Sequence, residues 1–339
     1  MKFNPNKLFY YYKRNNWMLH WPLAGLYKNI HIHKPVFLLG NQGDGITFIS
    51  RILRRNRDVV SISGNSNYWT GADEMATVLE LFLPPRLRLA GRLVRTDPDH
   101  PQFFQPRSWS YGSDDLYKQY HLTEHNKPSG REINAFRLGI QMALKRFGNS
   151  DSRFVDKSQV YTLKTRFIQE ILKDSDPNFV LFTRDPYISC YRAASGKAGD
   201  MSRYSSFLSF DERFNVCMEH WKNCMRTVLD DSHYLKNFKW LSLESYIKNI
   251  EEKTKELCTF LELSFEESML PSAEQVIPFG TKYAERWFPV QKTVNEKYIE
   301  KIPARYFDQA EEYLGDTAAL FGYHHPKKKL INETGHPGS

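Results

Sequence analysis

Residues 35–47 of this 339-residue chain read PVFLLGNQGDGIT, and this stretch decides how the rest of the sequence is interpreted. The apolar run that ends at Gly40 is typical of a strand buried on both faces of a parallel sheet. A turn rich in glycine follows, and the pattern after it predicts a helix from 46 to 55. Glycine lets the backbone approach an anion closely, and the N–H groups at a helix start stabilise phosphate or sulfate. The turn lacks the GK[ST] of a Walker A loop, so a purely structural turn is the alternative.

The chain downstream alternates between short apolar runs and amphipathic segments, which predicts an α/β fold. We expect a single P-loop-like domain whose central, mostly parallel sheet of about five strands is flanked by helices. Ligands of such sheets lie beyond the carboxyl ends of the strands, so the loops after the strands should converge on one site. The further strands are expected at 58–63, 153–156, 178–183 and 239–243, and the helices at 131–147, 160–173, 247–262 and 303–322, with one more around Phe214, Cys217, Trp221, Cys224 and Val228.

Three segments fall outside this regular pattern. Residues 1–34 are aromatic and basic, which predicts a leader that packs on the domain or rests on a membrane surface, where Trp, Tyr and Lys gather. Within the domain at 35–323, residues 84–130 are irregular and rich in proline, as in lids and binding loops, so we expect an acceptor loop there. Residues 324–339 are polar and predict a flexible tail.

Composition narrows the classes of partner and location. The net charge of +8 suits an anionic ligand, a nucleic acid or a membrane surface. The basic residues are scattered and no recognition motif occurs, so no nucleic-acid partner is expected. No apolar run reaches the length of a membrane span, and no signal-peptide core precedes the domain. Cys217 and Cys224 would lie about 10 Å apart on a helix, too far for a disulfide. We expect reduced thiols, no metal site and a cytoplasmic protein, with 1–30 available for peripheral membrane contact.

Three cationic side chains follow two of the predicted strands. Arg184 comes directly after the apolar run at 178–183, and Arg192 lies two turns along the helix that begins there. The planar fork of arginine suits phosphate, so both are candidate anion ligands, with surface salt bridges as the alternative. Lys157 ends the strand at 153–156, where a cation can stabilise charge on a leaving oxygen. A solvated lysine is the alternative for that position.

Three stretches together resemble sulfotransferases, and they are most similar to the tyrosylprotein branch. PVFLLGNQGDGITFISRIL at 35–53 is similar to the family's 5′-phosphosulfate loop, and DKSQVYTLKTRFIQEIL at 156–172 to its lysine motif. NFVLFTRDPYISCYRAAS at 178–195 resembles the segment that holds the 3′-phosphate. Similarity also occurs at 241–263, 297–303 and 320–323, so the resemblance covers about 35–323, although it is weak in 64–130.

The resemblance implies 3′-phosphoadenosine-5′-phosphosulfate as the sulfuryl donor. The backbone amides of Gly43, Asp44, Gly45, Ile46 and Thr47, with the Thr47 hydroxyl, would cradle the 5′-phosphosulfate. Arg184, with Arg192, would bind the 3′-phosphate, and Lys157 would stabilise the leaving phosphate oxygen. The implied reaction transfers the sulfuryl group to a hydroxyl or amine of a small molecule, glycan or peptide. Oligomeric state is not implied.

This sequence departs from the family pattern at several positions. Gly43 stands where the loop usually has Arg or Lys, Asp44 where Ser is usual, and Arg192 where the 3′-phosphate motif has Ser. The tyrosylprotein branch has a glutamate base just after its second strand, but Ser63, Gly64 and Asn65 occupy that region here. Glu74, at the next helix start, is the candidate base, with Asp73, His121, Glu124 and His125 as alternatives. Because the loop cation is missing, a non-catalytic nucleotide-binding protein of the same fold is the alternative function.

Overall fold

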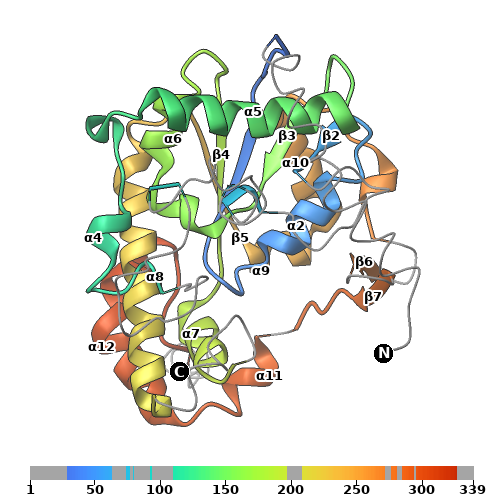
Figure 1. Cartoon of the computed structure of the whole chain (residues 1–339). Helices are drawn as coiled ribbons and strands as arrows, with labels where there is room; N and C mark the ends of the chain where they lie inside the picture. Colours follow the sequence, from blue (N-terminus) through green and yellow to red (C-terminus); the bar gives the residue numbers. More distant parts are fainter. Residues whose placement is uncertain are drawn as a thin grey trace, which may run out of the picture.

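Five parallel strands form the central sheet of the computed structural model, in the order β2-β3-β1-β4-β5 (Figure 1). The model describes residues 29–62, 74–76, 79, 92–93, 110–196, 208–271, 276–280, 285–293 and 295–326, with only the backbone at 276–280 and 285–289. β1 lies centrally, because Phe37 pairs with Asp156 of β3 and Leu39 with Leu181 of β4. The strands are β1 Val36–Leu39, β2 Val59–Val60, β3 Arg153–Asp156, β4 Asn178–Thr183 and β5 Asn237–Ser242.

Helices cover both faces of this sheet (Figure 1). Side chains alternate along β1, so Phe37 and Leu39 enter a cluster with α5, α6, α8 and α12, while Val36 and Leu38 pack with α2 and α10. The helices are α2 Ile46–Leu53, α4 Tyr117–Tyr120, α5 Gly130–Phe147, α6 Thr165–Ile171, α7 Pro186–Ala194, α8 Phe210–Ser232, α9 Leu243–Lys248, α10 Ile250–Leu261, α11 Glu296–Ile299 and α12 Ala304–Leu320, with the 3-10 turns η2 Glu124–Asn126, η3 Gln159–Leu163 and η5 Glu267–Met269.

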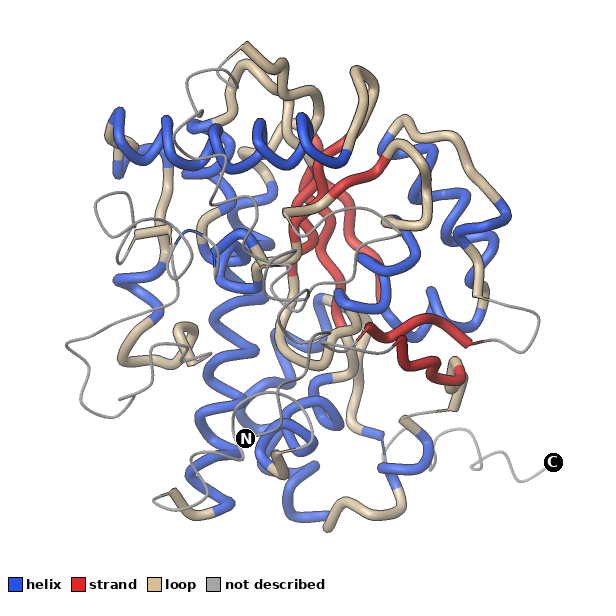
Figure 2. Tube along the Cα trace, turned by 45° about the vertical axis from the view of Figure 1, so that its right-hand side comes forward, coloured by secondary structure: helices blue, strands red, loops and turns tan. Residues whose placement is uncertain are grey.

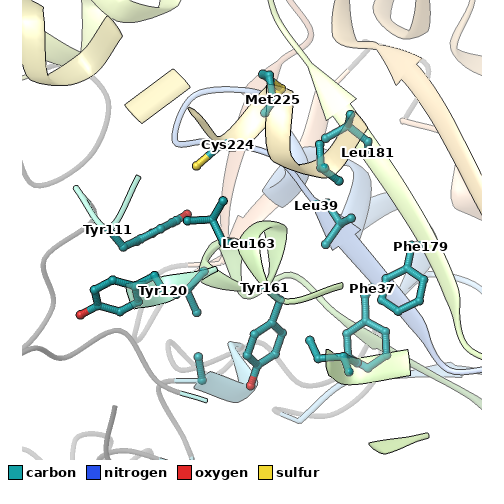
Figure 3. Packing of buried hydrophobic residues seen from close by; sticks show 14 of the residues in the cluster. Phe37, Leu39, Tyr111, Tyr120, Tyr161, Leu163, Phe179, Leu181, Cys224 and Met225 are labelled. Carbon is teal, nitrogen blue, oxygen red and sulfur yellow. The ribbon is translucent and has the colours of Figure 1, made fainter. Parts of the chain in front are cut away.

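The larger cluster is built on stacked aromatic rings from the two central strands. The Phe37 ring lies 5.6 Å from that of Phe179 and 6.2 Å from that of Tyr161, and Cys224 and Met225 approach from α8 (Figure 3). All four cysteines are buried and free, and Cys217 and Cys224 are not joined by a disulfide, as their spacing predicts. The predicted α/β fold with helices on both faces is therefore confirmed, and the five-stranded sheet is wholly parallel.

Several details differ from the sequence-based expectation. The strand predicted at 58–63 is shorter and spans only Val59–Val60. The helix predicted at 160–173 is interrupted at Lys164, whose buried amine hydrogen-bonds the Arg92 carbonyl. The helix predicted at 247–262 is divided between α9 and α10 at Asn249, whose backbone is non-helical. An antiparallel hairpin of β6 Val276–Gly280 and β7 Glu285–Pro289 was not predicted; β6 packs beside α2, and the hairpin stands apart from the five-stranded sheet (Figure 2).

The predicted peripheral segments are only partly within the described residues. In the predicted acceptor loop, residues 110–130 pack against the domain, and Tyr111, Leu116 and Tyr120 are buried in its core. Most of 84–109, together with 1–28 and 327–339, lies outside the described residues. His325 is 5% exposed and lies 3.2 Å from Asp308, so packing continues past residue 323. Among the helices described, none has the length and apolar character needed to cross a membrane.

Candidate active site

The turn after β1 packs so closely against its neighbours that two of its residues must be glycine. Gly40 and Gly45 have φ angles of +143° and +84°, which side-chain-bearing residues rarely adopt. A Cβ at Gly40 would lie 2.6 Å from the Phe182 carbonyl oxygen of β4, and one at Gly45 would lie 2.4 Å from Leu243 of α9. Gly43 also has a positive φ, of 97°. The turn is thus fitted against the ends of β4 and β5.

Asp44 stabilises the turn from inside rather than facing outward. Its Oδ2 accepts the Asn41 N–H at 2.7 Å, and its own N–H donates to the Asn41 carbonyl at 3.1 Å. The side chain is fully buried, and burial raises the pKa of its carboxyl well above the ordinary value, although the Asn41 hydrogen bond opposes this shift. Of the five backbone donors predicted for an anion, the Asp44 amide is therefore already engaged within the turn.

The remaining predicted donors lie where α2 begins. Gly45 caps the helix in a left-handed conformation, and the first N–H groups of a helix have no acceptor within it. Gly43, Gly45 and Thr47 are partly exposed, whereas the Ile46 side chain is buried in the smaller core cluster. The exposed edge of the turn thus carries backbone amides and the Thr47 residue.

Arg184, at the carboxyl end of β4, joins this turn to a segment near the C-terminus. Its Nη1 donates to the Gly43 carbonyl at 3.3 Å, while Nε and Nη2 donate to Asn295 Oδ1 at 3.0 and 2.7 Å. Burial and, to a smaller extent, the nearby Arg192 lower the pKa of Arg184 to about 10, so the guanidinium stays charged at neutral pH. The predicted convergence of the loops after β1 and β4 is therefore present.

Arg192, on the last turn of α7, supplies a second guanidinium close enough to Arg184 to affect its pKa. The group lies over the Tyr298 ring, 4.8 Å from the centroid. Its Nε and Nη1 are buried and have no hydrogen-bond partner among the described residues. Buried donors without partners are costly, so this pair of nitrogens is suited to an anionic ligand.

Lys157 follows β3, directly beside β1 in the sheet. Its Nζ lies 3.4 Å from Glu74 Oε1, and both side chains are mostly buried. The residues next to Lys157 hold this arrangement, because Asp156 Oδ1 accepts the Met75 N–H at 2.7 Å and Ser158 Oγ accepts the Ala76 N–H at 2.9 Å. Burial raises the pKa of Asp156 to about 6. The structure thus brings together the two residues predicted for catalysis.

The alternative bases have other partners. His121 Nε2 lies 3.2 Å from Asp231 of α8, and Glu124 accepts a hydrogen bond of 2.6 Å from Arg166 Nε. His125 is exposed and lies beside Glu124. The hydrogen bond to Arg166 lowers the pKa of Glu124, which makes it a weaker base. Ser63, Gly64, Asn65 and Asp73 lie outside the described residues.

A pocket of about 520 Å³ opens beside Arg184, between α9, α11 and the segment after α12. Glu244 organises its wall: its Oε1 accepts from Asn295 Nδ2 at 2.6 Å and from the Asp185 N–H at 3.0 Å, and its Oε2 accepts from Tyr323 at 3.1 Å. The wall consists of Arg184, Asp185, Leu243, Glu244, Ile247, Lys248, Lys292, Thr293, Asn295, Glu296, Ile299, Gly322, Tyr323, His324 and Pro326.

The sequence interpretation missed Asn295, Glu244 and Tyr323 as site residues. Each belongs to a stretch that resembles the family or lies next to one, but nothing in the local pattern indicates a contact with Arg184. Within the part of the chain that is described, no three His, Cys, Asp or Glu side chains are grouped to hold a metal ion.

The fold is similar to the sulfotransferase domain from the curacin biosynthetic pathway (14% identity, covering 87% of this chain and 100% of that one, TM-score 0.49). It is also similar to a sulfotransferase from Mycobacterium avium (10% identity, covering 92% and 82%, TM-score 0.49). No match was found among curated proteins. The profile of the sulfotransferase family matches residues 35–267, more than half of the sequence. The chain therefore belongs to the sulfotransferase family.

Proposed function

We propose that the protein transfers a sulfuryl group from 3′-phosphoadenosine-5′-phosphosulfate to a hydroxyl or amine of a small molecule, glycan or peptide. The observation that supports this proposal is the position of three groups, the turn after β1, Arg184 and Lys157, at the carboxyl edge of adjacent strands. The turn after β1 contacts Arg184 after β4, and Lys157 follows β3 on the other side of β1. Anionic ligands of parallel sheets bind at this edge.

The residues present fit a donor with two anionic ends. Gly43 and Gly45 are partly exposed and carry no side chain, so a phosphate can approach the backbone amides of the turn. The partnerless buried nitrogens of Arg192 suit a second phosphate, and the adjacent pocket has room for a nucleoside. When bound, the donor supplies an activated sulfuryl group attached to a phosphate leaving group.

The catalytic roles fall to Lys157 and Glu74. Glu74 accepts the proton of the acceptor hydroxyl or amine, and the ammonium of Lys157 stabilises the negative charge that develops on the leaving oxygen. Their 3.4 Å ion pair holds both groups at one point of the sheet edge. General acid–base catalysis of this kind contributes about 10²- to 10⁴-fold in rate.

The test is transfer of radiolabelled sulfate from 3′-phosphoadenosine-5′-phosphosulfate to a mixture of phenols, alcohols, amines, glycans and tyrosine peptides. Lys157→Ala and Glu74→Gln should each lower transfer about 100-fold or more. Lys173→Ala serves as the matched control, because Lys173 is a 71% exposed lysine on the surface beside α6 and should leave transfer unchanged. Full transfer by both Lys157→Ala and Glu74→Gln would refute these catalytic roles.

Calorimetry with adenosine 3′,5′-bisphosphate, together with the transfer assay, distinguishes a sulfotransferase from a non-catalytic nucleotide-binding protein of the same fold. Binding together with transfer supports the enzyme. Binding without transfer to any acceptor class supports the non-catalytic nucleotide-binding protein, the alternative that the missing loop cation suggests.

A further inference from the structure

A polar groove of about 480 Å³ lies between α8 and α12, with α4 at one side, and it shares no residue with the proposed active site. The two helices lie next to each other (Figure 1). They run in the same direction, because Arg305 of α12 contacts Asp211 of α8, and further along both helices Tyr313 contacts Lys222. The groove lies beside the C-terminal halves of both helices.

The groove is acidic, although the whole chain carries a net charge of +8. Four of its lining residues carry a carboxylate and only two, Lys222 and Arg226, are basic. Three of the carboxylates, those of Asp230, Glu312 and Asp316, have no ion-pair or hydrogen-bond partner among the described residues. Neither helix has a basic residue in its last turn. Carboxylates near a helix C-terminus and like charges four residues apart are both unfavourable, so the groove is suited to a cation.

Two threonine hydroxyls line the buried side of the groove. Thr227 of α8 is 8% exposed and Thr317 of α12 is 1% exposed. In the part of the chain that the structure describes, neither hydroxyl makes a hydrogen bond, not even the bond to the preceding turn that Thr254 makes in α10. Because a buried hydroxyl without a partner is costly, both oxygens are suited to accept hydrogen bonds from a ligand.

The spacing of the carboxylates excludes a metal ion as the ligand. No three His, Cys, Asp or Glu side chains within the described ranges are close enough to share an ion, and this includes the carboxylates of the groove. Glu312 and Asp316 are one helical turn apart, about 6 Å along the axis, and Asp230 belongs to the other helix. A ligand that neutralises all three must carry several positive charges along its length. An alkyl ammonium group also donates three hydrogen bonds, enough for a carboxylate and a hydroxyl together.

We infer that this groove binds a linear polyamine, whose ammonium groups pair with these three carboxylates and donate hydrogen bonds to the two threonine hydroxyls. The inference goes beyond the proposed sulfuryl transfer and does not depend on it, since none of its residues belongs to the turn after β1 or to the ends of the other strands. Lysine side chains of a protein carry the same ammonium group, so the test includes both sources.

Calorimetry on the full chain tests the site with spermidine, with an acetylated and amidated trilysine peptide, and with Mg²⁺, at about 0.15 M salt to screen exposed charges. Spermidine should bind at one saturable site, at least about tenfold more tightly than Mg²⁺. The double variant Glu312→Gln/Asp316→Asn should weaken spermidine binding at least about tenfold. Glu252→Gln/Glu300→Gln is the matched control, because it removes two exposed carboxylates outside the groove and should leave the affinity unchanged.

The hydroxyls are tested by a pair of substitutions at the more deeply buried threonine. Thr317→Val should weaken spermidine binding about three- to tenfold, and Thr317→Ser, which keeps the hydroxyl, should bind within about twofold of the unmodified chain. The loss in Glu312→Gln/Asp316→Asn cannot come from unfolding, since removing unfavourable charges near the end of α12 should leave the urea midpoint unchanged or higher.

Three results would overturn the inference. They are no saturable binding of spermidine, an affinity no higher than that for Mg²⁺, and an equal loss of affinity in the groove variant and the matched control. Tighter binding of the trilysine peptide than of spermidine would also reject a free polyamine and assign the groove to lysine side chains of a partner protein. Tighter binding of spermidine, lost in the groove variant alone, supports the polyamine.

Discussion

Replacing Gly45 by alanine should damage the fold and the anion-binding turn together. Gly45 has a φ of +84°, and a Cβ there would lie 2.4 and 2.9 Å from the two terminal methyl carbons of Leu243. The left-handed backbone costs a side-chain-bearing residue about 1–2 kcal/mol. Displacing the buried Leu243 adds about 1–2 kcal/mol, the low end of overpacking because a leucine methyl can rotate away. The expected loss of unfolding free energy is therefore about 2–4 kcal/mol.

Alanine variants of two other glycines distinguish the contribution of the left-handed backbone from that of the clash with Leu243. Gly322 has a φ of +72° with nothing within 4 Å of the added Cβ, so Gly322→Ala should cost only the backbone contribution of about 1–2 kcal/mol. Gly130 starts α5 and has open space around it, so its alanine variant should be neutral or slightly stabilising. Combining Gly45→Ala with Leu243→Ala removes the clash, so the double variant should lose about 1–2 kcal/mol less than the sum of the single variants.

Urea unfolding followed by circular dichroism measures these free energies of unfolding. Calorimetry with adenosine 3′,5′-bisphosphate measures the affinity of the turn for the nucleotide. Gly45→Ala should also weaken nucleotide binding, since the turn must move away from α9. The reasoning fails if Gly45→Ala costs no more than Gly322→Ala, or if the double variant is simply additive. Either result would mean that the turn is not packed against Leu243 in solution.

Three further predictions concern buried or capping side chains. Asp185 caps α7 by accepting the Tyr187 N–H, and burial raises its pKa to about 7. Because the folded state then holds its proton to higher pH than the unfolded state, stability should fall as pH rises from about 4 to about 7. Asp185→Asn should flatten that dependence in urea midpoints measured across this range. Burial lowers the pKa of Lys164 to about 7, so the protein should gain stability as pH rises from about 7 to about 10, and Lys164→Met should abolish the gain in the same assay. Ser129 forms a capping box with Glu132 at the start of α5, and Ser129→Ala should lower the unfolding free energy by about 1 kcal/mol; an unchanged urea midpoint would contradict the cap.

Most of the secondary structure could be predicted because the local pattern and the tertiary environment agree. The strand predicted at 153–156 is present at the same residues, and so is the one at 178–183. Short apolar runs bounded by turn residues have one favourable environment, the interior of a sheet covered on both faces. The breaks at Lys164 and Asn249 were not predictable, since helical periodicity continues through both positions. The hairpin of β6 and β7 was also missed.

The candidate site was likewise predictable in part. Parallel topology was enough to predict that Gly45, Lys157 and Arg184 lie at one edge of the sheet, because every parallel strand directs its carboxyl end there. The pairing of Lys157 with Glu74 was not predictable from spacing, since it depends on the caps that Asp156 and Ser158 provide to the helical residues after Glu74.

The sequence by itself determined the order along the chain of the five sheet strands and most helices, the glycine turn and the family to which the chain is similar. These properties depend on residues close together in the chain, so they are readable in the order in which the residues occur. Only the tertiary structure decided what lies beside Gly43. Arg184, Asn295 and Glu244 come from segments separated by 51 residues or more, and their hydrogen bonds exist only because the folded sheet brings those segments to one edge.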